Sequence, residues 1–562
     1  MAWPKISVGS SDFAEYRKGN YYYVDKTGLI EELLKTPGIK VTLITRPRRF
    51  GKTMNMSMLA EFFDIRKDSR PIFSGLKIAD NKELCEAWMN QWPVIHVTFR
   101  SVFGSCFKDA YSMIEAVIAE LYKQHIYLLE NPEMMVYDRE IFDRIAGKKA
   151  SGEEIKNSLL FLTRLLGQYY GKTVILLIDE YDVPLAKASD KGYYEEMLYV
   201  IRGILQALKD NSFLHLAVVT GCLRIAKESI FTGTNNFITD TISDNRLDEF
   251  FGFTQEEVDR ILADTQNTSH SQEIKNWYDG YRFGSTDVYC PWDVLNHCDK
   301  IKENAAAFPE NYWVHTSSNE AVKKIIQMSG NITTKREIER LLAGEEIVKE
   351  IRQELTYQEM YQSVENIWSL LFMTGYLTQR QRLDASHYKL AIPNLEVRDI
   401  FKTQIMEYFK EGVAKDGDTL KQLCDALKGG DAEKVERLFE GYLKKTISIR
   451  DTFVEKSLKE NFYHGILLGI LGVKEDWGVF SNRETGDGYS DIMIETEDSE
   501  MGIIIEIKYA GDGNLLNACE KALKQVEETK YEETLLENGV EKILKYGIAC
   551  YMKHCKVMCS ER

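Results

Sequence analysis

One stretch near the start of the chain, KVTLITRPRRFGKTMNMSMLAEFF, limits the fold more than any other. Residues 40–45 are mostly apolar or β-branched and predict a buried strand, and the residues after Thr53 are apolar at helical spacing. The turn between them ends in Gly51-Lys52-Thr53. A strand, a loop with GK[ST] and a helix form a P-loop, whose backbone amides and helix N-terminus hold phosphate oxygens. The stretch therefore predicts an α/β domain with a parallel sheet that binds a nucleotide.

The loop residues have distinct expected roles. Lys52 is expected to reach the β- and γ-phosphate oxygens of ATP, and the Thr53 hydroxyl to bind Mg²⁺. The common pattern has glycine where this chain has Arg46, so Pro47 is expected to help fix the turn. The loop residues expected to bind the nucleotide are Arg46, Pro47, Arg48, Arg49, Phe50, Gly51, Lys52 and Thr53.

A second strand of the same type ends in two acids. Residues 172–184, KTVILLIDEYDVP, are apolar without alternation up to Asp179-Glu180, as expected for a strand buried on both faces of a parallel sheet. Acids at the carboxyl end of such a strand lie beside the phosphate loop. We expect Asp179 to hold Mg²⁺ through water and Glu180 to polarise the water that attacks the γ-phosphate.

Two further segments, 92–99 and 213–221, read as strands of the same sheet, with helical crossovers between them. Thr220 ends the second of these strands, where a polar side chain can sense the γ-phosphate. Arg224 follows shortly after, and it either meets phosphate charge or is a turn residue.

Several motifs together resemble the bacterial AAA-ATPase-like family, which is related to the STAND-type signalling ATPases. They are YYYVDKTGLIEELL, RPRRFGKT, ILLIDEYDVPL, TGCLRIAKESIFTGTNNF, FFGFTQEEV and WYDGYRFG, and they cover about the first half of the chain. That family usually lacks the first P-loop glycine, so Arg46 is compatible with it. The resemblance also implies that residues 23–27 lie near the nucleotide base.

The middle of the chain has the pattern of helices followed by a hairpin. An apolar helix over 367–373 ends near Gly375, and two short extended stretches follow, separated by a polar turn. This order resembles a winged helix, which STAND-like ATPases often carry. The wing has Arg380, Arg382 and Lys389, but packing on the nucleotide domain is favoured over DNA contact because acidic residues surround it.

The last hundred residues contain a hydrophobic strand with charges inside it, IIIEIKYA. Side chains alternate along a strand, so Glu506 and Lys508 are expected on one face with Ile504. Asp491 begins the preceding strand, so Asp491 and Glu506 are expected to share one Mg²⁺, with Mn²⁺ as an alternative. Lys508 would then orient the attacking water or stabilise the developing phosphate charge.

The spacing D-x14-E-x-K, with Glu460 on the helix before it and Gln525 on the helix after it, is similar to the PD-(D/E)xK nuclease superfamily. The segments FYHGILLGIL, SNRETGDGYSDI and IIIEIKYA resemble the nuclease-like domain that follows the ATPase domain in the AAA-ATPase-like family. The resemblance implies a restriction-endonuclease-like α/β fold, a metal site that includes Glu460, and a supporting role for Gln525.

The C-terminal tail, CYMKHCKVMC, brings together Cys550, His554, Cys555 and Cys559. Paired CxxC spacing is missing, so a terminal pair of strands with buried free cysteines is favoured over a zinc site.

Charge limits the partners. The formal net charge is −16, which argues against a protein that coats nucleic acid non-specifically, so any nucleic-acid contact is expected to be local. Residues 451–562 hold 13 basic and 22 acidic residues, a net of −9. Apolar runs are short and the N-terminus has no signal-peptide pattern, so a cytoplasmic protein without a membrane span is expected. A homo-oligomer is left open.

We expect three parts: an AAA-like P-loop ATPase domain (1–285), a helical region with a winged helix (286–450) and a nuclease-like domain (451–562). The leading function is an ATP-binding and ATP-hydrolysing protein that controls a Mg²⁺-dependent nuclease acting on nucleic-acid phosphodiesters. The alternative is a nucleotide-dependent signalling or interaction ATPase whose nuclease-like domain is catalytically silent. A motor or helicase is disfavoured, since no basic strand channel or series of stacking aromatics is present.

Overall fold

The computed structural model describes residues 4–36, 38–224, 236–313, 319–330, 332–445, 456–474, 477–485, 488–496, 501–528, 532–537, 539–540 and 542–561. The chain divides into two compact units, Met1–Ser318 with Val348–Val397, and Asn319–Ile347 with Arg398–Arg562. The region 286–450, expected as one middle part, therefore contributes to both units. No helix among the described residues is both long and apolar enough to cross a membrane.

The first unit is built on a parallel five-stranded sheet with the order β2-β3-β4-β1-β5. Its strands are β1 (Val41–Thr45), β2 (Val94–Thr98), β3 (Val174–Asp179), β4 (Leu214–Gly221) and β5 (Phe237–Asp240). β1 and β3 are buried along their whole length, which explains why their sequences show no polar alternation. The register pairs Thr98 with Asp179 and Ile44 with Thr220, so the carboxyl ends of these strands meet at one edge.

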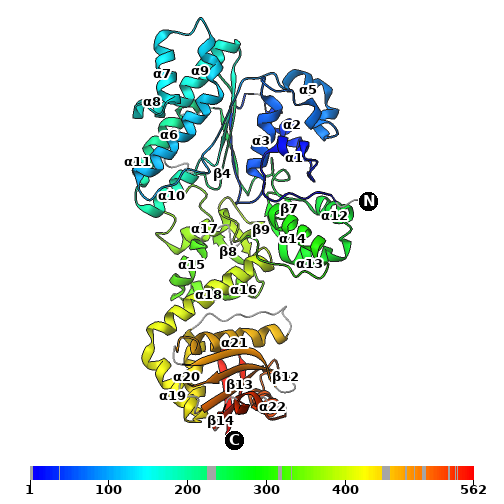
Figure 1. Cartoon of the computed structure of the whole chain (residues 1–562), viewed down its shortest axis with the longest axis vertical. Coiled ribbons are helices and arrows are strands. Elements are labelled where there is room, and N and C mark those ends of the chain that lie inside the picture. The colour runs from blue at the N-terminus through cyan, green and yellow to red at the C-terminus, as the bar shows by residue number, and fades with distance from the viewer. Residues whose placement is uncertain are drawn as a thin grey trace. The chain divides into compact units, whose positions relative to one another are not determined.

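Helices cover both faces of this sheet, as the continuous apolar strands predict. Figure 1 shows α6, α9 and α11 on one side of the sheet and α1, α2 and α3 on the other. The helices of this unit are α1 (Phe13–Lys18), α2 (Gly28–Leu34), α3 (Lys52–Phe63), α4 (Arg70–Phe73), α5 (Lys82–Trp88), α6 (Phe107–Gln124), α7 (Val136–Ala146), α8 (Gly152–Lys156), α9 (Ser158–Tyr170), α10 (Val183–Lys191), α11 (Tyr194–Ile204), α12 (Gln255–Asp264), α13 (Ser271–Tyr278), α14 (Pro291–Glu303) and α17 (Val364–Met373).

Short strands complete the first unit. The hairpin of β6 (Tyr281–Phe283) and β7 (Thr286–Val288) precedes α14, and α17 is followed by β9 (Thr378–Arg382) and β10 (His387–Ala391), with β8 (Ile347–Glu350) beside β10. The predicted order of helix and hairpin is present. The arginines of the β9–β10 hairpin are engaged within the chain: Arg380 donates to the Gly280 carbonyl at 3.2 Å, and Arg382 donates to the Asp384 carbonyl at 3.0 Å.

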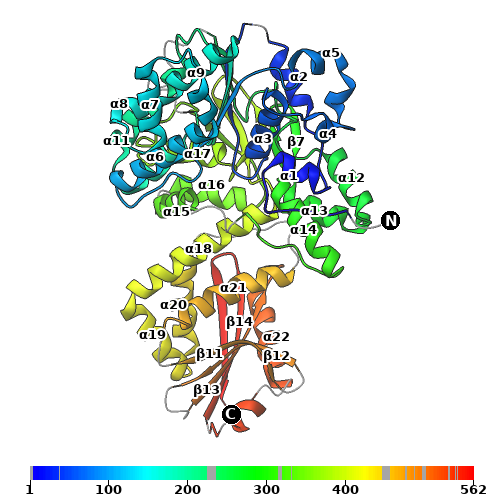
Figure 2. The same cartoon turned by 45° about the horizontal axis from the view of Figure 1, so that its top comes forward.

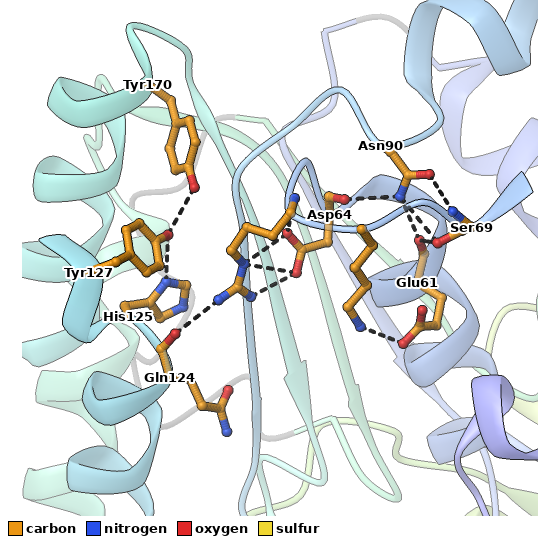
Figure 3. Close-up of polar contacts among 10 residues, drawn as sticks. Glu61, Asp64, Ser69, Asn90, Gln124, His125, Tyr127 and Tyr170 are labelled. Atoms are coloured by element: carbon orange, nitrogen blue, oxygen red, sulfur yellow. Dashed lines mark hydrogen bonds and ion pairs between the residues drawn. The ribbon is translucent and has the colours of Figure 1, made fainter.

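A polar network fastens the end of α3 to the helices on the opposite face of the sheet (Figure 3). Arg66 donates to both carboxylate oxygens of buried Asp64, over 2.7–3.2 Å, and to the carbonyl of Gln124 at 3.1 Å. Asn90 binds the carbonyl oxygens of Glu61 and Asp64 at 3.1 and 2.9 Å. The network fixes the far end of the helix that begins at the phosphate loop.

Replacing Asp64 is expected to destabilise the first unit. Asp64→Ala leaves the Arg66 guanidinium without its carboxylate partner, so we expect a loss of about 2–3 kcal/mol in the free energy of unfolding. Chemical denaturation followed by circular dichroism measures it. Lys67→Ala is the matched control, since it removes a more exposed ion pair with Glu61 on the same segment. An equal, small effect of both changes would contradict this role of Asp64.

The second unit contains a mixed five-stranded sheet with the order β11-β12-β13-β14-β15. The strands are β11 (Gly478–Thr485), β12 (Gly488–Glu495), β13 (Met501–Tyr509), β14 (Lys542–Tyr551) and β15 (His554–Glu561). All neighbours are antiparallel except β13 and β14, which are parallel. The helices are α15 (Glu320–Gln327), α16 (Ile332–Leu342), α18 (Leu395–Lys415), α19 (Gly417–Lys428), α20 (Ala432–Lys445), α21 (Lys456–Leu471), α22 (Leu515–Glu528) and α23 (Glu533–Glu537).

The two faces of this second sheet bury different partners, as can be followed in Figure 2. Ile503, Ile505 and Ile507 belong to the core formed with α19, α20 and α21. Ile504 belongs to a separate core with Met493 of β12 and Val526 of α22. The alternation predicted for IIIEIKYA is therefore present, with even-numbered residues on the face covered by α22.

The predicted terminal strand pair is confirmed. β14 and β15 form an antiparallel hairpin in which Cys550 lies opposite Cys555 and Tyr551 lies opposite His554. Cys550 and Cys555 are buried free thiols in the core of the unit. Their side chains therefore serve packing, as expected for buried cysteine.

Candidate functional site

The phosphate loop connects β1 directly to α3. Arg49 and Gly51 have positive φ angles of 72° and 83°, so the chain turns sharply before α3 begins at Lys52. Glycine adopts this backbone conformation without steric cost. The sharp turn presents the first amides of α3 at the carboxyl edge of the sheet, where an anion can bind.

The side chain of Arg46 is not among the residues that line the pocket at the loop, in contrast to the prediction. Its side chain is fully buried, and its Nη1 donates to the carbonyl oxygens of Thr45 and Asp240 at 2.9 and 3.0 Å. Its guanidinium also lies 5.3 Å from the ring of Phe251 and 5.5 Å from that of Phe283. Burial lowers the pKa of Arg46 to about 10. This arginine occupies the core at the end of β1 and β5, where a glycine would leave a void.

Phe50 and Pro47 hold the loop against the rest of the unit. Phe50 is fully buried, and its ring centroid lies 4.9 Å from those of Tyr281 and Phe283 in the β6–β7 hairpin. Pro47 lies against Gly375, where an added Cβ would approach it to 3.0 Å. The loop conformation therefore depends on packing contacts that replace the conformational freedom of the missing glycine.

Lys52 is buried among carbonyls and acids. Its Nζ donates to the carbonyl oxygens of Arg46 and Pro47 at 3.0 and 3.1 Å, and lies 3.4 Å from a Glu180 carboxylate oxygen. Burial alone would lower its pKa, but neighbouring Cys222 and the charges of Glu180, Asp182 and Asp179 raise it overall. Lys52 is therefore a permanent cation in this site.

Asp179 gathers three threonine hydroxyls from three segments. Thr53 and Thr98 donate to its Oδ2 at 2.9 and 3.3 Å, and Thr220 donates to its Oδ1 at 2.6 Å. The carboxylate is fully buried. β4 lies between β1 and β3, which is why Thr220 can reach Asp179. The structure thus brings together Thr53, Asp179 and Thr220, which were all predicted for the site.

The acids after β3 take two different positions. Glu180 has a positive φ of 54° and lines the pocket beside Lys52. Asp182 is buried and accepts hydrogen bonds from the backbone N–H groups of Cys222 and Leu223 at 2.9 and 3.0 Å. Burial and the Glu180 charge raise the pKa of Asp182 to about 6. Asp182 was not predicted, although its place in the DEYD sequence is a usable signal.

A pocket of about 410 Å³ opens at the loop, a volume suited to a small-molecule ligand. Arg48, Arg49, Gly51, Lys52, Thr53 and Glu180 line one part of it. The other part is lined by residues distant in sequence, including Tyr22, Tyr23, Val24, Phe253, Trp292 and Leu295. Of these, only Tyr23 and Val24 were expected near the nucleotide, from the family resemblance. Arg49 places its guanidinium 3.7 Å from the ring of Trp292.

Arg224 is not among the residues that line this pocket. Its Nη1 lies 3.2 Å from a carboxylate oxygen of Glu354. Residues 225–235, which continue the motif that begins at Thr220, lie outside the described residues. Of the two readings of Arg224, the pairing with Glu354 favours a turn residue over one that meets phosphate charge.

A second group of acids lies in the other unit, on the α22 face of its sheet. Asp491 precedes Met493 by two positions, and Glu506 and Lys508 follow Ile504 at alternate positions, so all three share the face of Met493 and Ile504. Asp491 Oδ2 accepts a hydrogen bond from the Ile507 N–H at 2.7 Å. Lys508 Nζ lies 2.8 Å from Glu506 Oε1. The predicted carboxylate pair and lysine are therefore neighbours.

Glu506 shows the signs of a metal-binding carboxylate. It is 2% exposed, and its Oε2 has no hydrogen-bond partner among the described residues. Burial, followed by the charge of Asp491, raises its pKa to about 7. A divalent cation would relieve this repulsion and satisfy the free oxygen, so the donor set fits Mg²⁺ or Mn²⁺. Burial alone would lower the pKa of Lys508, but the neighbouring carboxylates of Glu506, Glu460 and Asp491 raise it overall.

The flanking helices hold the remaining predicted residues. Glu460 of α21 accepts a hydrogen bond from the Tyr509 N–H at 3.0 Å, beside the end of β13. Gln525 of α22 is half-buried, directly before Val526 of the α22 core. His464 of α21 was not predicted, and its Nε2 lies 2.8 Å from the Asp491 carbonyl oxygen. A lone histidine in an apolar helix has no sequence pattern that would have predicted its place beside Asp491.

The raised pKa of Glu506 makes the stability of this unit depend on pH. Between pH 4.5, near the ordinary pKa, and about 7, folded Glu506 holds a proton that the unfolded chain releases. The free energy of unfolding therefore falls as pH rises through this window, by about 3 kcal/mol at most. Glu506→Gln is expected to remove this part of the pH dependence, whereas exposed Glu528→Gln is not.

Hydrogen exchange of the β13 amides measures this pH dependence of the free energy of unfolding. It is recorded in EDTA at pH 5 and pH 7.5 and corrected for intrinsic exchange rates. The same pH dependence in both variants would contradict the assignment.

Comparison with known proteins gives two family matches. Residues 7–231 match a family described as predicted AAA-ATPase, and residues 458–560 match the PD-(D/E)XK nuclease superfamily. An "Uncharacterized protein in vnfD 5'region" of Azotobacter chroococcum mcd 1 is 28% identical over 449 residues, which cover 79% of this chain and 78% of the relative.

Among solved structures, the Aeropyrum pernix ORC2 protein, in ADPNP–ADP complexes, is 11% identical to this chain. The match covers 72% of this chain and 96% of that chain at a TM-score of 0.23, which is too low to establish a shared arrangement.

Proposed function

We propose that this chain, which carries an AAA-ATPase-like segment and a PD-(D/E)XK-type segment, binds and hydrolyses ATP and thereby controls a metal-dependent nuclease that cleaves nucleic-acid phosphodiesters. The observation that carries the proposal is the convergence of Asp491, Glu506 and Lys508 on one face of the second sheet. The P-loop pocket with buried Lys52 supports the nucleotide half.

In the nucleotide site, the charges suit a triphosphate. Lys52, already cationic and facing Glu180, exchanges its contacts with loop carbonyls for phosphate oxygens when ATP binds. Thr53 and Asp179 would hold Mg²⁺, which neutralises the charge that develops on the phosphates. Glu180 orients the water that attacks the γ-phosphate.

In the nuclease site, Asp491 and Glu506 would hold Mg²⁺ or Mn²⁺, with Glu460 beside them. Such an ion lowers the pKa of a bound water and stabilises phosphate charge. Lys508 keeps its proton because the surrounding carboxylates raise its pKa. We therefore assign Lys508 to stabilising the negative charge of the phosphate during attack, rather than to taking a proton from water.

The alternative is a nucleotide-dependent signalling ATPase whose nuclease-like domain does not cut. The net charge of −9 over residues 451–562 favours it, because nucleic acid is bound through phosphate neutralisation by lysine and arginine. Under this alternative, Asp491 and Glu506 of the second sheet have a structural role and no catalytic one.

One assay separates the two functions. The purified full chain is incubated with duplex DNA, single-stranded DNA and RNA, in Mg²⁺ or Mn²⁺, with ATP, ADP or no nucleotide. The nuclease proposal expects metal-dependent cleavage of at least one nucleic acid, at a rate that changes with the nucleotide. ATP binding without any cleavage would favour the silent domain. Cleavage at the same rate with every nucleotide would contradict control by ATP.

A further inference from the structure

Two histidines and a glutamate lie together where α13 and α14 pack against each other. His270 ends a short 3₁₀ turn directly before α13, Glu273 lies on the first turn of α13, and His297 lies in the middle of α14. The spacing of three residues between His270 and Glu273 puts both on one side of the helix. Among the described residues, these three form the one group of His, Cys, Asp or Glu whose ligand atoms all approach one another within 4.8 Å.

The distances within the group suit coordination. His297 Nε2 lies 3.3 Å from Glu273 Oε1, and His270 Nδ1 lies 3.5 Å from Glu273 Oε2. Ligand atoms about 2.0–2.1 Å from a tetrahedral Zn²⁺ are separated from one another by about 3.3–3.4 Å. The two measured separations are therefore close to those expected between ligand atoms that share one tetrahedral ion.

His297 lacks the partners that a buried histidine normally has. Its side chain is fully buried, and neither ring nitrogen makes a hydrogen bond among the described residues, although Glu273 Oε1 is within 3.3 Å. A buried polar group without a partner is unfavourable, so these ring nitrogens are available to a ligand.

We infer that His270, Glu273 and His297 form a binding site for a divalent transition-metal ion, Zn²⁺ above all. Imidazole and carboxylate ligands in this number suit Zn²⁺ rather than Mg²⁺, which prefers oxygen ligands. Three protein ligands leave a fourth position for water, and Glu273, with its side chain 36% exposed, connects the site to solvent.

The bound ion fastens α13 to α14 and so affects the nucleotide pocket. Pro291, Trp292 and Leu295 of α14 line that pocket, and His297 follows Leu295 by two residues on the same helix. A metal site at this point of α14 stabilises the helix that supplies one wall of the pocket. The site is separate from the Lys52 and Glu506 sites and does not depend on their activity.

The test is metal binding by the full chain. Protein stripped with a chelator is titrated with Zn²⁺ against a competing chromophoric chelator, and with Co²⁺ by visible absorption, in excess Mg²⁺ to occupy the oxygen sites. The wild type is expected to bind about one Zn²⁺ tightly at this site and to show the intense absorption of tetrahedral Co²⁺. Zn²⁺ should also raise the melting temperature.

Matched variants locate the ion. His270→Asn and Glu273→Gln change partly exposed ligands and are each expected to weaken Zn²⁺ binding about 100-fold and to remove the Co²⁺ absorption. His387→Asn is the control, because exposed His387 also lies beside a carboxylate three residues away, at 2.9 Å from Asp384. Equal Zn²⁺ affinity in all variants and the wild type, an equal loss in the control, or no tight binding by the wild type would overturn the inference.

Discussion

Lys52→Ala is expected to bind ATP about 10- to 100-fold more weakly than the wild type. The change removes a buried cation that would make charge-assisted hydrogen bonds to phosphate oxygens, each worth about 1.5–3 kcal/mol. It also leaves the carboxylate of Glu180, which lines the pocket, facing the triphosphate without compensation. Isothermal titration with ATP and with ADP measures the loss.

Two further variants distinguish a loss of ATP binding from a general effect on the fold and from a loss of ATP hydrolysis. Lys67→Ala removes a lysine beyond the other end of α3, so its ATP affinity should equal that of the wild type. Glu180→Gln should keep ATP affinity but slow hydrolysis about 100-fold, since its proposed role is to orient water. Unchanged ATP affinity in Lys52→Ala, with wild-type circular dichroism, would remove Lys52 from the nucleotide site.

The central part of the candidate nucleotide site could be predicted because its residues are close in sequence and carry a local pattern. The strand before Gly51 is apolar or β-branched, and the strand that ends in Asp179 is apolar up to that residue. Parallel pairing alone brings their carboxyl ends to one edge. The opposite wall of the pocket could not be predicted in this way. Phe253 and Leu295 reach it from separate segments, through tertiary packing that no local pattern reveals.

Arg46 shows where a motif misleads. Its position in the loop predicted nucleotide binding, but its side chain turns into the core against Phe251 and Phe283. A long side chain can place its charged group well away from its own backbone, and only the full structure shows which neighbours receive it. Arg224, for which two readings were open, has a partner that is also far away in the sequence, Glu354.

In the second unit, the alternation of side chains along β13 was sufficient to predict which residues share a face. The period of two put Glu506 and Lys508 on one face, and the structure confirms that Ile504 shares this face with Met493 and Val526. The burial of Glu506, and the raised pKa that follows from it, required the tertiary structure, because neither depends on local sequence.

Glu506→Ala is expected to reduce the rate of nucleic-acid cleavage by about 10²–10³-fold. The change removes the buried carboxylate that faces Asp491 and Lys508 and so removes half of the proposed metal site. Cleavage rates at saturating Mg²⁺ or Mn²⁺ on the preferred nucleic acid measure it. Binding of that nucleic acid should change little, because the site is acidic and contributes little to holding phosphates.

The control is Asp512→Ala, which removes an exposed acid just after β13 and should leave the cleavage rate unchanged. Lys508→Ala should also slow cleavage while leaving metal affinity nearly intact, because a lysine has no role as a ligand. A common loss in all three variants would indicate damage to the fold rather than to the site. Full activity in Glu506→Ala, with ATP still bound at the Lys52 site, would place the cleavage elsewhere and leave the second unit without a catalytic role.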